Sequence, residues 1–257
     1  YEDEGILMVT PASTSPDITE RGYELVFRTI GLDSMQGPVA ANYLISQKPE
    51  RVAVVHDKQQ YGEGIATAVR DTLEEAGVEV AMFEGITAGA KDFSSLVTKL
   101  RQADVDYVYY GGYHPELGLI LRQAQQADLD ATFMGPEGVG NKDINTIAGE
   151  AAEGLLVTLP PSFDEKDENQ ELVQAFEEKG EDPSGPFVLT SYTAVQLIAD
   201  GIEAAESTDP FDVAEALRAG TFQTPIGTVE YDNKGDMESF EFVVYEWHSD
   251  GSKTPVN

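Results

Sequence analysis

The sequence contains no cysteine among its 257 residues, and it contains only three histidines, at positions 56, 114 and 248. The lack of cysteine excludes disulfide bonds, thiolate catalysis and cysteine-bound zinc, and it leaves the redox compartment open. Because the histidines are far apart in the sequence, we expect neither a histidine metal site nor a catalytic triad. No hydrophobic run is long enough to cross a bilayer, and the first residues do not resemble a signal peptide.

Basic residues are scarce as well. Lysine and arginine number 16 against 47 aspartates and glutamates, which gives a formal net charge of −31. Such a charge disfavours nucleic acid and anionic membranes as partners, because their phosphates would be repelled. The simplest interpretation is an acidic, hydrated surface suited to high salt, where self-repulsion is screened. The length and the 41% of apolar residues are sufficient for two compact domains or one large one.

Several catalytic and cofactor motifs are absent. The sequence has no Walker-type phosphate loop, no H-E-x-x-H and no G-x-S-x-G. The segment GEGIAT at 62–67 resembles a dinucleotide fingerprint, but threonine replaces its last glycine and its glutamate would repel a pyrophosphate. The acidic segment 232–236 lacks the distal glutamate of an EF-hand. It fits better as a hairpin turn between strands expected at 227–231 and 240–247. We therefore expect no metal and no cofactor.

What the sequence does contain is a regular alternation of strand and helix patterns. Its centre is 105–116, where a β-branched and aromatic strand leads through Gly111-Gly112 into a helix that begins near Pro115. Further strands are expected at 6–9, 51–56, 78–83, 132–134 and 155–159, and further helices at 34–46, 64–76 and 92–103. This alternation predicts an α/β fold with a doubly wound parallel sheet. Helices are expected after Pro160-Pro161 at 171–179, 187–205 and 210–219, so a domain boundary near Pro160 is predicted.

Ligands of open α/β sheets bind at the loops that follow the carboxyl ends of the strands. Four expected loops of this kind lie at 11–14, 56–61, 111–113 and 135–138. Together they offer hydroxyls, backbone N–H groups, two tyrosines and the carboxylate of Glu137. Each has a plainer interpretation, a surface tyrosine or a solvated carboxylate. Facing a cleft, however, they would complement a zwitterion with an apolar side chain.

Segments spread over the whole chain carry a more specific signal. Among them are GLDSMQGP at 31–38, HDKQQYGEG at 56–64, YYGGYHPE at 109–116 and FMGPEGVGN at 133–141. With these segments the chain resembles the periplasmic leucine/isoleucine/valine-binding proteins of ABC importers. The resemblance implies a two-lobed type I periplasmic binding protein fold that closes on one amino acid. Lobe 1 would comprise 1–32 and 162–240, and lobe 2 would comprise 33–161 and 241–257.

The family's contacts to the main-chain atoms of its ligand fall on three positions here. In the resemblance, Ala12 and Thr14 of the first loop bind these atoms, and the threonine donates to the α-carboxylate. Ser13 stands between them where the family has alanine, which leaves the backbone contacts possible. Glu137 would be the counter-ion of the α-ammonium, a charge-assisted pair of the strong kind.

The family's side-chain pocket falls on Tyr61, Tyr113 and Phe187. These aromatic residues would line the pocket or close over the ligand from the facing lobe. The resemblance also implies that two strand–helix units precede the YEDEG segment in the family, so we expect lobe 1 to be incomplete in this chain. Those units would supply another aromatic residue over the ligand and a serine that binds the ligand's α-carboxylate together with Thr14.

The resemblance implies a non-catalytic solute-binding protein of the periplasm, with its signal peptide removed. It would capture leucine, isoleucine or valine as a monomer and deliver it to the membrane permease of an ABC importer. The alternative is an amino-acid- or amide-sensing regulatory or receptor domain on the same fold. The absence of a nucleophile–base motif disfavours an enzyme, and the absence of an added output domain disfavours a regulator.

Overall fold

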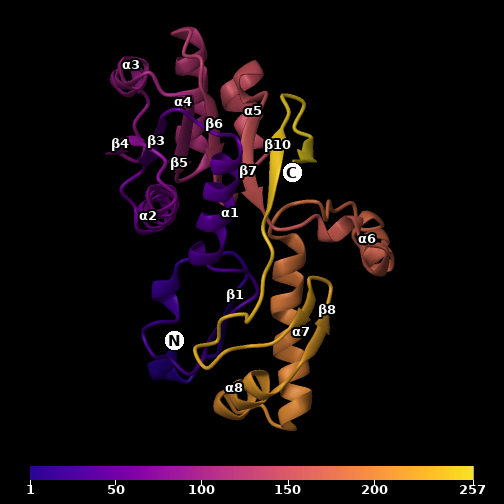
Figure 1. The fold of residues 1–257 in the computed structure, drawn as a ribbon. Coiled ribbons are helices and arrows are strands. Elements are labelled where there is room, and N and C mark those ends of the chain that lie inside the picture. Colours follow the sequence, from indigo (N-terminus) through magenta and orange to yellow (C-terminus); the bar gives the residue numbers. More distant parts are fainter. Residues whose placement is uncertain (257) are drawn as a thin grey trace. The chain divides into compact units, whose positions relative to one another are not determined.

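The computed structural model describes residues 1–256, which divide into two compact units (Figure 1). Unit 1 comprises Tyr1–Leu32 and Pro160–Glu241, and unit 2 comprises Asp33–Leu159 and the described residues from 242 to 256. Each unit is described by itself below. Within the described residues no helix combines the length and the apolar character that a membrane crossing requires.

Unit 2 is built on a seven-stranded sheet with the order β11-β10-β7-β6-β5-β3-β4. Its strands are β3 (Val52–His56), β4 (Val80–Gly85), β5 (Tyr107–Gly111), β6 (Thr132–Gly135), β7 (Leu155–Leu159), β10 (Val243–Trp247) and β11 (Lys253–Pro255). The five strands from β4 to β7 run parallel, whereas β10 and β11 add an antiparallel edge. The helices are α1 (Asp33–Ser46), α2 (Gln60–Glu75), α3 (Ser94–Ala103), α4 (His114–Gln126) and α5 (Asp143–Ala148).

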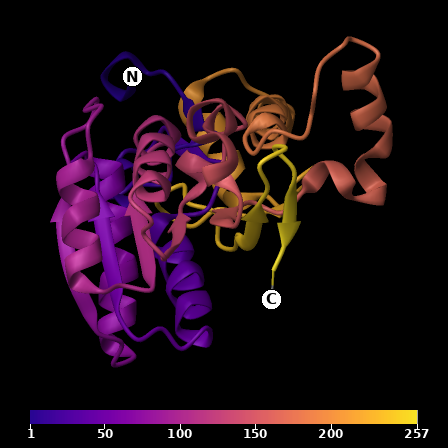
Figure 2. The same ribbon diagram turned by 90° about the horizontal axis from the view of Figure 1, so that it is seen from above.

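Strand β5 shows why this sheet is covered on both faces. Val108 and Tyr110 point into one hydrophobic cluster, which includes side chains from α3, α4 and α5. Tyr107 and Tyr109, which alternate with them, join a second cluster with side chains from α1 and α2. Successive side chains of a strand point to opposite faces, so a strand apolar at every position needs a helix layer on each side. Figure 2 shows these purple to magenta helices packed along the strands.

The chain order of the parallel strands creates a topological switch point in unit 2. Across the sheet, β3 lies between β4, which follows it in the sequence, and β5, which comes after β4. The connection therefore changes direction between β3 and β5. In sheets with this order, the loops at the carboxyl ends of the two central strands diverge and leave a crevice in which ligands bind.

Unit 1 is smaller in strand content. Parallel strands β1 (Met8–Thr10) and β2 (Val26–Arg28) form one ladder, and β8 (Phe222–Thr224) and β9 (Gly227–Val229) form an antiparallel hairpin. Its helices are α6 (Gln170–Glu177), α7 (Val188–Ala205) and α8 (Pro210–Ala219), with a short 3₁₀ helix η2 (Pro16–Ile18) after β1. The start of α8 is set by Asp209, whose side chain accepts a hydrogen bond from the Phe211 amide at 2.9 Å.

The hairpin expected between 227–231 and 240–247 was wrong. Strand β9 pairs with β8, and β10 pairs with β7 in the sheet of unit 2. The acidic turn 232–236 does form, with the Asp232 amide bonded to the Asp236 carbonyl at 2.9 Å. It is closed by a single antiparallel bridge between Tyr231 and Met237. The expected partner was a sequence neighbour, but β10 finds a longer apolar strand, β7, far away in the chain.

Candidate functional site

Tyr61 is placed by the first turn of α2 rather than by a loop. Helix α2 begins four residues earlier than the sequence pattern indicated, at Gln60. The Asp57 carboxylate accepts a hydrogen bond from the Gln59 amide at 2.9 Å and so supports this early start. A Cβ added at Gly111, the last residue of β5, would overlap the carbonyl oxygen of Gly62. The glycine therefore lets the start of α2 pack directly on the carboxyl end of β5, at the switch point.

Tyr113 follows the glycine turn after β5 and stands at the N-cap of α4. Gly112 has a φ of +154°, and a Cβ there would lie 2.5 Å from the Tyr110 hydroxyl, so a side chain at this position would be strained. Tyr113 is 47% exposed. Its centroid lies 5.2 Å from that of Tyr61, with 41° between the ring planes. The two tyrosines thus form one aromatic wall.

Glu137 lies against this wall. It begins a 3₁₀ turn after β6 and Pro136, and it is only 3% exposed. The Tyr61 hydroxyl donates to Glu137 Oε1 at 2.8 Å and accepts from the Gly138 amide at 3.2 Å. A single phenol hydroxyl therefore fixes both the carboxylate and the backbone beside it. The interpretation of Glu137 as a solvated carboxylate was wrong, because the carboxylate is buried and hydrogen-bonded.

Two further polar residues of this site lie on α1, and neither was predicted from the sequence. Asp33 and Gln36 are 3% and 0% exposed and lie three residues apart, on one face of the first turn of the helix. Gln36 Nε2 donates to Thr158 Oγ1 at 2.9 Å. Its side chain also bonds to Glu137, whereas the negative charge of Asp33 repels the ionised Glu137 carboxylate. The signal available in the sequence was the segment DSMQ, two polar residues on the buried face of a helix.

Burial and like charge perturb the proton affinity of Glu137. Desolvation is the main cause that raises its pKa, to about 7, and the neighbouring charge of Asp33 adds to it. Hydrogen bonds from Tyr61 and Gln36 stabilise the charged form and limit the rise. A carboxylate in this state favours either a proton or an external cation.

In unit 1, the first predicted loop runs from Pro11 to Ser15 between β1 and η2. Thr14 is 1% exposed, and Ala12 is partly buried. The Thr10 hydroxyl accepts a hydrogen bond from the Ser13 amide at 3.1 Å, which turns the chain directly after the strand. The carbonyl of the same Thr10 accepts from the Thr29 amide at 3.0 Å. The loop therefore begins at a fixed point of the β1–β2 ladder.

Phe187 stands at the N-cap of α7, also in unit 1, and is partly buried. The Thr29 hydroxyl, just after β2, donates to the Thr190 carbonyl at 2.9 Å, and the Thr190 hydroxyl donates to the Phe187 carbonyl at 3.1 Å. This chain of bonds links the first turn of α7 to the ends of β1 and β2. The three predicted residues of unit 1 thus belong to connected segments.

The described residues hold one cluster with metal-ligating side chains, formed by Glu153, Glu246 and His248. His248 Nδ1 lies 3.0 Å from Glu153, and its Nε2 contacts Thr254. The hydrogen bond from the Ser249 amide, and after it that of His248, lowers the pKa of Glu153 to about 2. Because both ring nitrogens are already engaged, the cluster gives no support to a metal site.

Comparison with known proteins identifies the family. A model of the family described as periplasmic binding protein matches residues 1–252. The chain belongs to the periplasmic binding protein family. It is 60% identical over 257 residues to the leucine-, isoleucine-, valine-, threonine-, and alanine-binding protein of Pseudomonas aeruginosa, and covers 69% of that relative. It is 54% identical over 255 residues to the Leu/Ile/Val-binding protein of Escherichia coli K12, again covering 69% of it.

Solved structures of periplasmic binding proteins agree with this assignment. A leucine binding protein, LivK, from Thermotoga maritima has a TM-score of 0.91 and 29% identity, with 100% of this chain and 73% of that one covered. An ABC transporter substrate-binding protein from Desulfitobacterium hafniense, in complex with Leu, has a TM-score of 0.80 and 28% identity, covering 100% and 75%. The predicted α/β, type I periplasmic binding protein fold is confirmed.

Proposed function

We propose that this chain belongs to a solute-binding protein that captures leucine, isoleucine, valine or a similar apolar amino acid for an ABC importer. The observation that carries the proposal is the buried Glu137 carboxylate, which bonds to the hydroxyl of Tyr61, a residue whose ring also packs on that of Tyr113. The names of relatives at 54–60% identity support the choice of ligand class. The raised pKa of Glu137 fits a group that completes its charge balance with a ligand cation.

In unit 2, Glu137 would bind the α-ammonium of the amino acid. An ammonium beside a buried carboxylate forms a charge-assisted hydrogen bond and relieves the cost of burying that charge. Tyr61 holds the carboxylate in place through its hydroxyl, and its ring together with that of Tyr113 would contact the apolar side chain. An amino acid with a second charge in its side chain would bury that charge against these rings without a partner.

In unit 1, the loop that carries Ala12 and Thr14 would bind the main-chain atoms of the ligand. The Thr14 hydroxyl would donate to the α-carboxylate, and a loop carbonyl would accept from the ammonium. Phe187, at the start of α7, would add an apolar contact to the ligand side chain. No bond of the ligand is broken in this scheme, so the protein would act without catalysis.

The proposal includes a place and a partner. A periplasmic binding protein of an importer releases its ligand to a membrane permease, so we infer a periplasmic location and a permease as the macromolecular partner. A monomer is sufficient for this role, because all six proposed contacts come from one chain. The acidic surface, with a net charge of −31, would be tolerated by a partner that is not itself acidic.

Isothermal titration of the natural protein with a panel of amino acids tests the proposal. Leucine, isoleucine and valine should bind far more tightly than lysine or aspartate. A buried charge without a partner costs several kcal/mol, whereas one methylene more or less changes affinity by roughly 1 kcal/mol. Equal binding of leucine and lysine would contradict the proposal. A turnover assay on the bound ligand, expected to be negative, separates capture from catalysis.

A further inference from the structure

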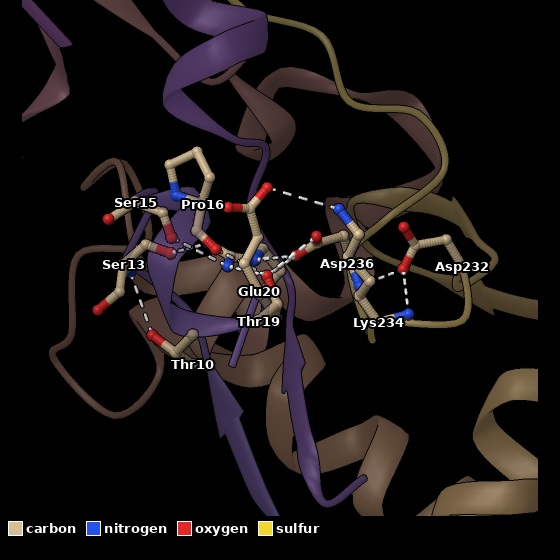
Figure 3. A network of polar contacts seen from close by, with 10 residues as sticks. Thr10, Ser13, Ser15, Pro16, Thr19, Glu20, Asp232, Lys234 and Asp236 are labelled. Atoms are coloured by element: carbon tan, nitrogen blue, oxygen red, sulfur yellow. Dashed lines mark hydrogen bonds and ion pairs between the residues drawn. The ribbon is translucent and has the colours of Figure 1, made fainter. Parts of the chain in front are cut away.

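Unit 1 contains a buried arginine whose side chain holds the loop that carries Thr14. Arg28, the last residue of β2, is 0% exposed. Its Nη1 donates to the Ser13 carbonyl at 2.7 Å, and its Nη2 donates to the Ser15 carbonyl at 3.1 Å. Figure 3 shows Ser13 and Ser15 drawn together on the same side of this network. One guanidinium therefore holds the backbone on both sides of Thr14.

The arginine is itself held from two directions. Its Nε donates to Asp236 Oδ1 at 2.6 Å, and both side chains are nearly inaccessible, at 0% and 6% exposure. The Thr19 hydroxyl accepts from Nη2 at 2.9 Å and donates to the Asp236 carboxylate at 2.8 Å. Figure 3 shows Thr19 between the loop and Asp236. The positive charge is thus neutralised by a carboxylate that a second bonded group keeps in position.

Asp236 is the last residue of the acidic turn 232–236, which follows Tyr231. Its amide donates to Asp232 Oδ1 at 3.0 Å, which closes the turn around its own first residue. Gly235 has a φ of +89°, and a Cβ there would overlap the Val26 carbonyl. Its own carbonyl accepts from the Arg28 amide at 3.2 Å. The turn is therefore pressed against β2 in a way that a side chain at Gly235 would prevent.

These contacts restrict the loop strongly. Hydrogen bonds to the carbonyls of Ser13 and Ser15 fix the peptide that leads into Thr14 and the peptide that follows Ser15. The two residues between them keep little freedom. A binding loop that is ordered before its ligand arrives does not lose that conformational entropy on binding, so it binds more tightly than a mobile one.

We propose that Arg28, with Asp236 and Thr19, is a positioning residue for recognition of the ligand's α-carboxylate by the Thr14 loop. Arg28 acts through the loop backbone and does not itself contact the ligand. This inference rests on the proposed function for its ligand, but its effect on the loop can be measured without any ligand.

The first test compares leucine with leucinamide, which lacks the carboxylate, in the natural protein. Arg28→Met should weaken leucine binding by roughly tenfold, the cost of ordering a released loop, and leucinamide binding by less than about threefold. Arg28→Lys should restore part of the preference for leucine. Thr19→Val, which removes one hydroxyl and leaves the ion pair, should give a smaller shift in the same direction. It takes the place of Arg28→Met if that variant folds poorly.

The control is Leu217→Ala in α8, which opens a cavity in the core of the same unit without touching the network. Its melting temperature should fall, yet its preference for leucine over leucinamide should stay at the parent value. If Arg28→Met and Thr19→Val also keep the parent preference while losing melting temperature, Arg28 is only a structural residue and the inference is wrong.

The second test is hydrogen exchange of the unliganded protein. Exchange of the amides at 13–15 should rise at least about tenfold in Arg28→Met and measurably in Thr19→Val, but not in Leu217→Ala. Unchanged exchange in the Arg28 variants would overturn the positioning role. If the parent binds no amino acid, the proposed function fails and the role in carboxylate recognition fails with it. Raised exchange in the same variants would then still establish that Arg28 orders the loop.

Discussion

Each unit buries a carboxylate near the carboxyl end of a strand, Asp236 in unit 1 and Glu137 in unit 2. The surroundings of the two charges differ. In unit 1, Asp236 is paired with Arg28 at 2.6 Å, so the charge is compensated within the protein. In unit 2, burial and, after it, the like charge of Asp33 raise the pKa of Glu137 to about 7. The first arrangement fixes a loop, whereas the second leaves a demand for a proton or a ligand cation.

The two clusters differ in the free energy that is needed to bury their charges. A buried ion pair approaches balance only if its geometry is good and its remaining donors are satisfied, as the bonds of Arg28 to Ser13, Ser15 and Thr19 provide. A buried carboxylate beside another destabilises the folded protein when ionised. A rigid, neutral cluster and a strained, acidic one are therefore different kinds of polar interior, and only the second changes with pH near neutrality.

The largest effect is expected from breaking the compensated pair. Arg28→Met leaves Asp236 buried without its cation and should lower the free energy of unfolding by about 3–5 kcal/mol. The double variant Arg28→Met with Asp236→Leu removes both charges and should recover a large part of that loss. Denaturant unfolding measures both, with Arg21→Met, at an exposed arginine of the same unit, as control. A loss no greater than that of the control would contradict the comparison.

Glu137→Gln should have the opposite effect on stability. The folded pKa of Glu137, about 7, exceeds the ordinary value of 4.5, so the ionised carboxylate destabilises the folded state increasingly as pH rises from the lower value to the higher. At about pH 8 the free energy of unfolding of the variant should therefore exceed that of the parent by up to about 3 kcal/mol, and its melting temperature should be higher. At about pH 4 the two proteins should differ little.

The same change should weaken leucine binding. The ligand ammonium would be buried without its counter-ion, which costs on the order of 2–5 kcal/mol, or roughly 30- to several-thousand-fold in affinity. Isothermal titration checks this, with Glu150→Gln, at an exposed glutamate of the same unit, as control. Retention of leucine within about threefold of the parent affinity would show that Glu137 is not the ammonium site.

The contrast between the units also explains what could be predicted from the sequence. Strand β5 and the glycine turn after it were predicted because their pattern is local: an uninterrupted apolar run, two glycines and a helix start. Strand β7 was predicted with its observed bounds for the same reason. The pairing of β10 was predicted wrongly, since its partner depends on a contact distant in the chain.

The candidate site shows the same division. Tyr61, Tyr113 and Glu137 follow strands that were predicted, and the structure brings their side chains into contact. Asp33 could not be assigned, because its effect on Glu137 depends on where α1 packs. Arg28 had a weak signal, a single charge within the apolar segment LVFRTI. Such a charge must have a partner, but the sequence does not say that it is Asp236.

A smaller effect is expected from changing the acidic cluster without removing Glu137. Because ligand binding requires the ionised carboxylate, leucine affinity in the parent should fall about tenfold for each pH unit below about 7. Asp33→Asn removes the like charge, lowers the pKa of Glu137 and should flatten this dependence. Titrations in buffers of different ionisation enthalpy should find about one proton released on binding at about pH 6 in the parent and fewer in the variant.

Asp130→Asn, at an exposed aspartate of unit 2, is the control for this experiment. It should keep the pH dependence of the parent, because its side chain lies in solvent. If Asp33→Asn and Asp130→Asn behave alike, Asp33 does not act on Glu137, and the acidic character assigned to this cluster would be wrong.

The smallest effect is expected from screening the exposed charges with salt. This experiment distinguishes the surface charges from the two buried clusters. With a net charge of −31, self-repulsion destabilises the folded chain at low salt. Raising sodium chloride from about 0.01 M to about 1 M shortens the screening length from about 30 Å to about 3 Å. The melting midpoint should therefore rise by several degrees, roughly the effect of 1–2 kcal/mol in a protein of this size.

The pH dependence of leucine affinity, in contrast, should change little over the same range of salt, because Glu137 is buried and buried charges are screened much less than exposed ones. Potassium chloride at equal ionic strength should reproduce the rise in the midpoint. A rise with sulfate alone would indicate exclusion of the salt from the protein surface rather than screening. A midpoint that stays flat in both chlorides would mean that the acidic surface is not under appreciable self-repulsion, and its interpretation as an adaptation to salt would fail.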